Sequence, residues 1–168
     1  MLAVSLVFVG IALVINGVSR LFKIDAKSTA VINLIAGGVL LICNVILLSK
    51  ATVTVDYINA TSGLLFGFTY IFIACNLLFK LDLRPFGWYS LFVATYAAVM
   101  AVLAFISKSW FYGALWIAWL ILWLEGFLEI VCKAKLGKVF PWLSIAEGIF
   151  AAFIPAILIF LEVSFTLS

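Results

Sequence analysis

Residues 86–107 read FGWYSLFVATYAAVMAVLAFIS, and no charged side chain interrupts them. A helix rises about 1.5 Å per residue, so about 20 apolar residues cross the roughly 30 Å hydrocarbon core of a bilayer. Similar runs fill the rest of the chain, of which 68% is apolar and only 10% charged. Such a composition lies far outside the range of soluble domains and predicts an all-α integral membrane protein.

The apolar runs predict a bundle of six transmembrane helices. We expect these helices at about 2–22, 28–49, 61–79, 86–107, 109–132 and 139–162. The connections between them are short, and no Gly-, Pro- or Ser-rich linker separates any part. Residues 1–168 are therefore expected to form a single membrane domain.

Basic residues concentrate in alternate connections, which predicts the orientation of the chain. Only Lys50 and Lys108 belong to the second and fourth connections, whereas the first, third and fifth hold Arg20, Lys23, Lys27, Lys80, Arg84, Lys133, Lys135 and Lys138. Cytoplasmic loops of membrane proteins carry an excess of Lys and Arg. Both termini are therefore expected to be extracytoplasmic, and the net charge of +3 gives no reason to expect nucleic acid.

A repeat runs through the basic connections. FKIDAK at 22–27 is followed by FKLDLR at 79–84, and RPFGWYS at 84–90 by KVFPWLS at 138–144. We interpret the repeat as three helix hairpins, each turning at a basic connection, with approximate threefold internal symmetry. The alternative is that cytoplasmic loops rich in Lys and Arg resemble one another without duplication.

Three tryptophans form a stripe in WIAWLILW at 116–123. At about 100° per residue, Trp116, Trp119 and Trp123 fall within a sector of about 60°. Trp119 and Trp123 lie about 13 Å and about 20 Å along the helix from Trp110, too deep for an interfacial aromatic belt. Each buried indole N–H needs an acceptor. The stripe indicates either helix packing or the wall of a passage.

A carboxylate within the sixth run favours the passage. Glu147 is embedded in IAEGIFAAF at 145–153, and no Lys, Arg or His lies at membrane depth to pair with it. An ionisable side chain within a membrane is costly and indicates function by default. Phe66 and Tyr70 lie one turn apart in LLFGFTY, and Gly63 and Gly67 form a G-x-x-x-G step that permits close helix approach.

Flat apolar walls with a few inward polar groups suit a small, planar, uncharged solute. The amide faces of such a solute can lie against aromatic rings, while its N–H groups donate to π faces or to a carboxylate. Ions would lose their hydration with little replacement. Shape and dehydration would therefore set the selectivity.

The whole chain resembles the AmiS/UreI family of urea and amide channels. The resemblance rests on MLAVSLVFVGIALVING, KSTAVIN, LLFGFTY, RPFGWYSLFVA, WIAWLILW and PWLSIAEGI, in this order. It implies a homohexamer in a bacterial inner membrane, with one pore per protomer and passive passage of urea or short-chain amides. By position, it implies that the pore is lined by Leu6, Val9, Leu13, Asn16, Phe66, Tyr70, Trp119, Leu122, Trp123 and Glu147.

Two features depart from the family pattern. Acid-gated members have long outer loops with histidines, whereas this chain has no histidine and expected outer connections of only about 50–60 and 108–110. We therefore predict no histidine gating, so any acid response would require Asp56 or the buried glutamates. Glu125 has no counterpart in the pattern and is expected at a neighbouring protomer or a water pocket, while Glu129 is expected to be solvated.

Three other classes of protein are alternatives to a passive channel. A proton-coupled small-amide transporter would use Glu147 and Glu125 as carriers, although no basic partner accompanies them. A membrane enzyme is disfavoured because the chain lacks histidine and the H-E-x-x-H, G-x-S-x-G and Walker sequences. A structural subunit would use the aromatic stripe only for packing. No cofactor or metal is expected, and the expected partners are the permeant solute and membrane lipids.

Overall fold

The computed structural model describes residues 1–163, in which helices joined by turns account for the secondary structure. Five continuous helices come first, namely α1 (Leu2–Phe22), α2 (Ala26–Ser49), α3 (Thr54–Phe79), α4 (Arg84–Ile106) and α5 (Trp110–Ile130). The last span consists of α6 (Val139–Glu147), the π-helix η1 (Gly148–Phe153) and α7 (Ile154–Phe160). All six spans are long and apolar enough to cross a membrane, which confirms the predicted fold class.

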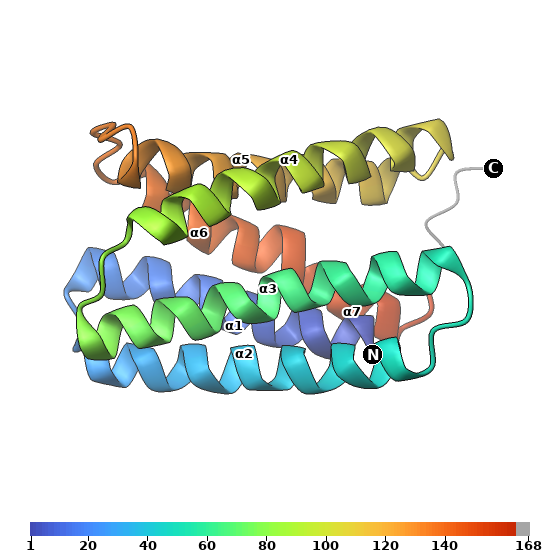
Figure 1. The fold of residues 1–168 in the computed structure, drawn as a ribbon, viewed down its shortest axis with the longest axis horizontal. Helices are drawn as coiled ribbons and strands as arrows, with labels where there is room; N and C mark the ends of the chain where they lie inside the picture. The colour runs from blue at the N-terminus through green and yellow to red at the C-terminus, as the bar shows by residue number, and fades with distance from the viewer. Residues whose placement is uncertain (164–168) are drawn as a thin grey trace.

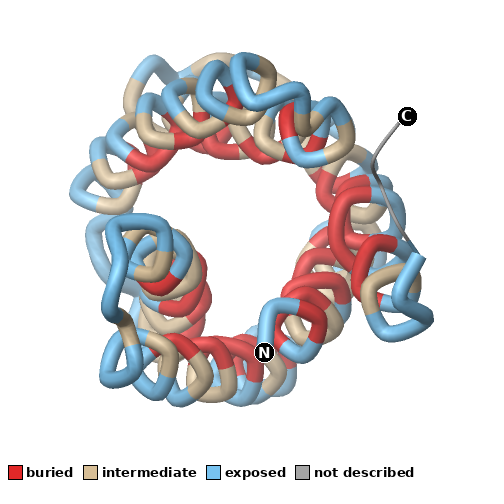
Figure 2. The backbone as a smooth tube through the Cα atoms, turned by 90° about the vertical axis from the view of Figure 1, so that its right-hand side faces the viewer, coloured by how far each residue is buried: buried red, intermediate tan, exposed pale blue. Residues whose placement is uncertain are grey.

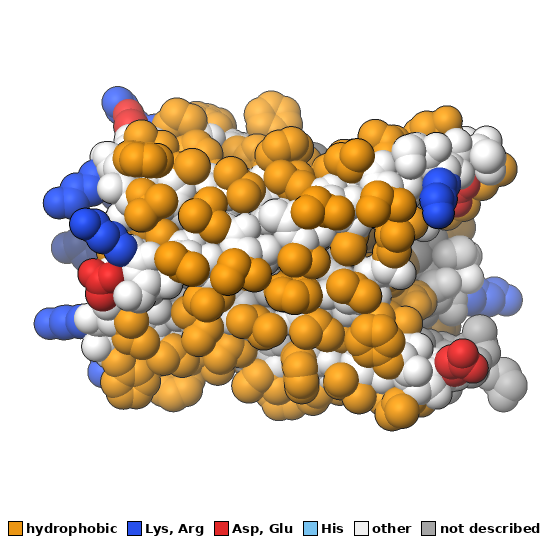
Figure 3. Space-filling view, turned by 90° about the horizontal axis from the view of Figure 1, so that it is seen from below, with side chains coloured by type: hydrophobic (Ala, Val, Ile, Leu, Met, Phe, Trp, Pro, Cys, Tyr) orange, Lys and Arg blue, Asp and Glu red, His pale blue; other side chains and the backbone are white. Residues whose placement is uncertain are grey.

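The spans run up and down along one axis (Figure 1). Viewed along that axis they form a ring, and their buried residues face inward (Figure 2). The N-terminus and the end of α7 lie at one end of this ring, opposite the turns that follow α1, α3 and α5. Lys and Arg side chains gather at those turns (Figure 3), so we name this the basic end. That the basic end faces the cytoplasm stays a prediction.

The repeated motif at the basic end adopts a repeated local structure. α1 ends at Phe22 and α3 at Phe79, and the lysine that follows, Lys23 or Lys80, has φ 53° in each case. Lys133, shortly after α5, has φ 59°. A residue in the left-handed region ends a helix by redirecting the backbone. The turns that follow α1 and α3 therefore share one means of ending a helix.

The aspartates of the motif begin the next helices. Asp25 accepts a hydrogen bond from the backbone N–H of Ser28 (2.8 Å), and Asp82 accepts one from that of Arg84 (2.9 Å). The bond from Ser28 holds the pKa of Asp25 below its ordinary value, and the side chain of Arg84 holds the pKa of Asp82 at about 2. Because these hydrogen bonds stabilise the helix starts, α2 and α4 begin two residues before the predicted apolar runs.

The connection expected at about 50–60 is much shorter in the structure, because α3 already begins at Thr54. The carboxylate of Asp56 accepts hydrogen bonds from the backbone N–H groups of Thr52 (3.1 Å) and Val53 (3.3 Å). These bonds satisfy donors that a helix start leaves unpaired. The expected boundary at 61 was wrong because polar residues in the first two turns obscured the helix.

The helices pair differently from the predicted hairpins. The closest pairs are α2 with α3, α4 with α5, and α1 with the span α6–η1–α7, so the two tight hairpins turn at the end opposite the basic turns. Their connections there are very short. In the first pair, an added Cβ at Gly63 would overlap the side chain of Asn44, and one at Gly67 would lie 2.8 Å from Leu41. Small residues thus permit this close approach.

The α3 and α4 backbones do not pack closely, and side chains bridge them instead. The hydroxyl of Tyr89 donates to the carbonyl of Leu65 (2.6 Å), and that of Tyr96 donates to the carbonyl of Ile58 (3.2 Å). Long tyrosine side chains therefore close the ring where the two hairpins meet.

Candidate functional site

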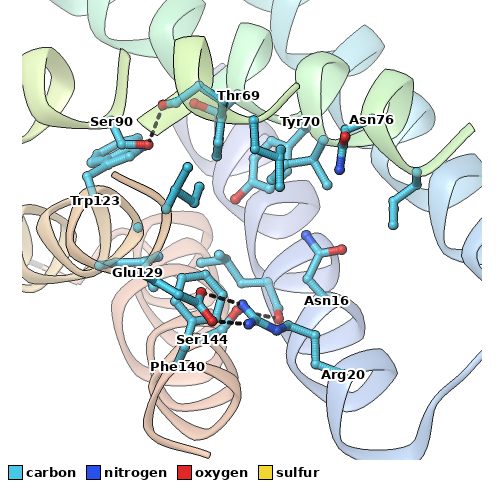
Figure 4. A pocket seen from close by; sticks show the side chains of 18 of the residues that line it. Asn16, Arg20, Thr69, Tyr70, Asn76, Ser90, Trp123, Glu129, Phe140 and Ser144 are labelled. Atoms are coloured by element: carbon cyan, nitrogen blue, oxygen red, sulfur yellow. Dashed lines mark hydrogen bonds and ion pairs between the residues drawn. The ribbon is translucent and has the colours of Figure 1, made fainter. Parts of the chain in front are cut away.

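A cavity of about 570 Å³ opens at the basic end. Leu13, Phe66 and Trp119, near the middle of α1, α3 and α5, mark its deep end, whereas Arg20 and Lys133 mark its mouth. Figure 4 shows side chains from several helices converging on this space. The cavity therefore occupies one half of the ring, which we name the cavity half.

Most residues expected in the pore line this cavity, namely Leu13, Asn16, Phe66, Tyr70, Trp119, Leu122 and Trp123. Phe66 contacts both deep indoles in edge-to-face geometry, with ring centroids 5.0 Å from Trp119 and 4.4 Å from Trp123. Edge-to-face contacts hold aromatic rings in defined orientations. The deep end is thus a wall of three fixed rings.

The third member of the stripe lies elsewhere. Trp116 is half-buried and does not line the cavity; it packs edge-to-face on Trp119 (4.9 Å) and on Tyr96 of α4 (6.0 Å). The indole nitrogen of Trp119 is buried and has no hydrogen-bond acceptor among the described residues. An unpaired N–H in such a place is costly. The Trp119 N–H is therefore an unused donor, buried within the wall at the deep end of the cavity.

Leu6, Val9 and Glu147 do not line the cavity. Leu6 and Val9 are buried in the apolar cluster that also contains Phe66, Trp119 and Trp123. They lie beyond the deep end, toward the N-terminus, where the ring interior is packed. We name this other half of the ring the packed half, and a solute crossing the ring would have to pass through it.

Glu147 ends α6 beside the deep end of the cavity and is 5% exposed. Its carboxylate oxygens have no hydrogen-bond partner among the described residues, and it interacts electrostatically with Tyr70 and Glu125. The π-helix η1 starts directly after it and precedes Pro155, which cannot donate a bond to the carbonyl of Ala151. π-Helical segments occur often at functional sites.

Glu125 is buried within the protomer itself, at 6% exposure. Of its two expected positions, contact with a neighbouring protomer was therefore wrong, and a water pocket stays a prediction. It interacts electrostatically with Glu147, Glu129 and Arg20, and its oxygens have no hydrogen-bond partner in the described part of the chain. Although Glu125 lies opposite the tryptophan stripe on α5, the ring also buries that flank of the helix.

Glu129 is only partly solvated, because it pairs with Arg20 at the cavity mouth. An Arg20 N–H donates to a Glu129 carboxylate oxygen (3.0 Å), and a second hydrogen bond joins the same side chains. The guanidinium group also lies over the ring of Phe140, 4.4 Å from its centroid. This pair joins α1 to α5 across 109 positions of sequence, so no local pattern indicated it.

Four further residues of α3 also line the cavity and were not predicted from the sequence. Thr69, Ile73, Asn76 and Leu77 line the cavity. They follow Phe66 at 3, 7, 10 and 11 positions, which is the spacing of one helix face. Extending that face by two turns would have identified them.

A family model described as the AmiS/UreI family transporter matches residues 1–163. A protein named acid-activated urea channel, from Helicobacter pylori (strain J99 / ATCC 700824), is 38% identical, over 96% of this chain and 98% of its own length. A putative amidate substrates transporter protein from Mycolicibacterium smegmatis is 34% identical, over 93% of this chain and 75% of its own length.

Solved structures agree with this result. The fold is similar to the Helicobacter pylori urea channel, as seen by cryoEM in a closed state (TM-score 0.90) and in a crystal structure (TM-score 0.89). Each comparison covers 96% of this chain and 98% of that channel, with 42% sequence identity.

Proposed function

The chain belongs to the AmiS/UreI family, and from that premise we propose that it is a passive channel for urea, short-chain aliphatic amides or both. Its family and relatives are channels and transporters rather than enzymes. The cavity lies inside the ring of a single chain, which supports one pore per protomer. The observation that carries the proposal is the deep wall of Phe66, Trp119 and Trp123, with a buried and unpaired indole N–H.

This wall suits a planar solute better than a spherical or charged one. A urea or amide plane can lie along the rings, while the N–H of Trp119 donates to its carbonyl oxygen. Cations and anions would lose their hydration against apolar rings. At the mouth, the negative charge of Glu129 neutralises the positive charge of Arg20.

Passage beyond the deep end would use the residues that the cavity does not reach. Leu6, Val9 and Glu147 lie in or beside the cluster that closes the packed half. We propose that they form the constriction, with the Glu147 carboxylate accepting N–H groups of the solute. Side-chain motion in this cluster would then open the way.

The membrane setting follows from the charge pattern and the outer surface. Large apolar side chains are exposed around the ring and fit contact with lipid or with other protomers. The basic end would face the cytoplasm under the positive-inside rule, with both termini extracytoplasmic. A bacterial inner membrane and a homohexamer complete the proposal, and both rest on family membership.

Gating by histidine is not expected, since the sequence contains none. The connections at the end opposite the basic turns are also short, because α3 follows α2 after residues 50–53 and α5 follows α4 after residues 107–109. Such short turns leave little chain to form a gate.

The test is solute entry into proteoliposomes, followed by stopped-flow light scattering. We expect urea or acetamide to enter much faster than in empty liposomes and glycerol to enter slowly. Rates should differ by less than about twofold between about pH 7 and about pH 5, the range in which histidine would titrate. Entry no faster than in empty liposomes would refute the channel. Accumulation of solute against its gradient when a proton gradient is imposed would refute passive transport.

A further inference from the structure

The side chains of Asn16 and Asn33 form a reciprocal amide pair between α1 and α2. Asn16 Nδ2 donates to Asn33 Oδ1 (2.9 Å), and Asn33 Nδ2 donates to Asn16 Oδ1 (2.7 Å). The two residues differ in position. Asn16 lines the cavity, whereas Asn33 lies behind it and is 0% exposed.

Asn33 can adopt only one orientation. Its Nδ2 group also donates to the backbone carbonyl of Thr29 (3.0 Å), and a carbonyl accepts hydrogen bonds but cannot donate them. Rotating the Asn33 amide by 180° would place its oxygen against that carbonyl and lose this bond. Asn33 Oδ1 is therefore directed toward Asn16, where it requires an N–H, and this requirement fixes the orientation of the Asn16 amide as well.

The fixed amide of Asn16 keeps unused hydrogen-bonding capacity. A carboxamide has two N–H donors and an oxygen with two lone pairs. The pair uses one N–H and one lone pair of Asn16, which leaves one of each. Figure 4 shows Asn16 on α1 beside the cavity, across from the α3 side chains Tyr70 and Asn76.

We propose that Asn33 is a positioning residue of the pore, which holds Asn16 so that its spare N–H and oxygen bind an amide or urea solute in the cavity. The inference rests on the proposed function and adds a solute-binding step on the cavity side of the aromatic wall. A group that is already oriented loses less conformational freedom when it binds. A solute that has both a carbonyl acceptor and N–H donors matches what Asn16 offers.

A purely structural role is the competing explanation, because buried polar side chains often join helices within membranes. Asn44 provides a matched control. It lies on the same helix as Asn33, is 3% exposed, and donates to the carbonyl of Leu40 (2.8 Å). Asn44 does not line the cavity. It therefore shares the burial and hydrogen bonding of Asn33 without its connection to Asn16.

The experiment is a double-mutant cycle on the ratio of urea to glycerol permeability in proteoliposomes, at matched protein density. Asn33→Ala and Asn16→Ala should each lower this ratio about 3- to 10-fold, the effect of one net hydrogen bond. The double variant should lower it no further than either single variant, because Asn33 acts only through Asn16. Asn44→Ala should leave the ratio within about twofold of the wild type.

Several results would overturn the inference. They are an unchanged ratio in Asn33→Ala, additive effects in the double variant, and an equal loss of ratio in Asn44→Ala. If Asn33→Ala does not assemble, Asn33→Leu retains the side-chain volume without the hydrogen bonds and takes its place. Failure of the wild type to conduct either urea or acetamide would instead refute the proposed function, so the two failures are distinguishable.

Discussion

The cavity half and the packed half are built from the same helices yet differ in their interior side chains. Phe66, Tyr70 and Trp123 project into the cavity half, where amide, hydroxyl and charged groups also line the space. In the packed half, Leu6 and Val9 close the interior together with other aliphatic and alanine side chains, such as Leu115, Ala152 and Ala156.

One helix can therefore have two roles along its length. α1 is an example, because Leu6 and Val9 pack at one end whereas Asn16 and Arg20 line the cavity at the other. Substitutions in the packed half should therefore affect assembly first, and substitutions in the cavity half should affect solute passage first.

The largest effect is expected for Gly10→Ala in the packed half. A Cβ at Gly10 would lie 2.8 Å from the carbonyl oxygen of Gly148. This is a backbone atom, so no change of side-chain rotamer can relieve the contact. Overpacking of this kind costs about 1–3 kcal/mol. Thermal unfolding followed by tryptophan fluorescence should show a clear loss of stability, with less assembled protein recovered. Gly38→Ala is the control, since a Cβ there meets nothing within 4 Å. Equal losses in both variants would contradict the close approach of α1 to η1.

A smaller effect, confined to transport, is expected for Trp123→Ala in the cavity half. Removing this indole takes away one of the two rings that hold Phe66, so the flat wall is lost. Urea permeability should fall about tenfold, equivalent to about 1.4 kcal/mol, while the protein stays folded. Stopped-flow measurements on Trp123→Ala and on Trp88→Ala, whose indole is exposed on α4, give the comparison. Unchanged urea flux through a folded Trp123→Ala variant would favour a structural role for the stripe.

The smallest effect is expected for Arg20→Gln at the cavity mouth. The pair with Glu129 is partly exposed, with side chains 41% and 27% accessible, and exposed ion pairs contribute little. Urea flux should change by less than about twofold at physiological salt. A loss as large as that of Trp123→Ala would show that the mouth limits passage as much as the aromatic wall does.

Part of the site was predictable because it follows from helix periodicity. The spacing of Phe66 and Tyr70, and of Trp119 and Trp123, placed each pair on one helix face, and both faces line the cavity. Periodicity could not show that Trp116, unlike Trp119 and Trp123, lies outside the cavity, because its position depends on contact with Tyr96 of α4. The pairings of Arg20 with Glu129 and of Asn16 with Asn33 were also inaccessible, since they join different helices.

Local composition and motifs were sufficient to predict the six spans, the clustering of basic residues at one end and the family. The free energy of transferring a segment into a membrane is nearly the sum of its residues' contributions, so local composition is sufficient to predict a span. The folded arrangement was needed to show that α2 pairs with α3 and α4 with α5, that Glu125 lies inside the protomer, and that the cavity ends at Phe66 and Trp119. Helix pairing depends on the shapes of facing surfaces, such as Gly63 against Asn44, and residues far apart in sequence create these surfaces together.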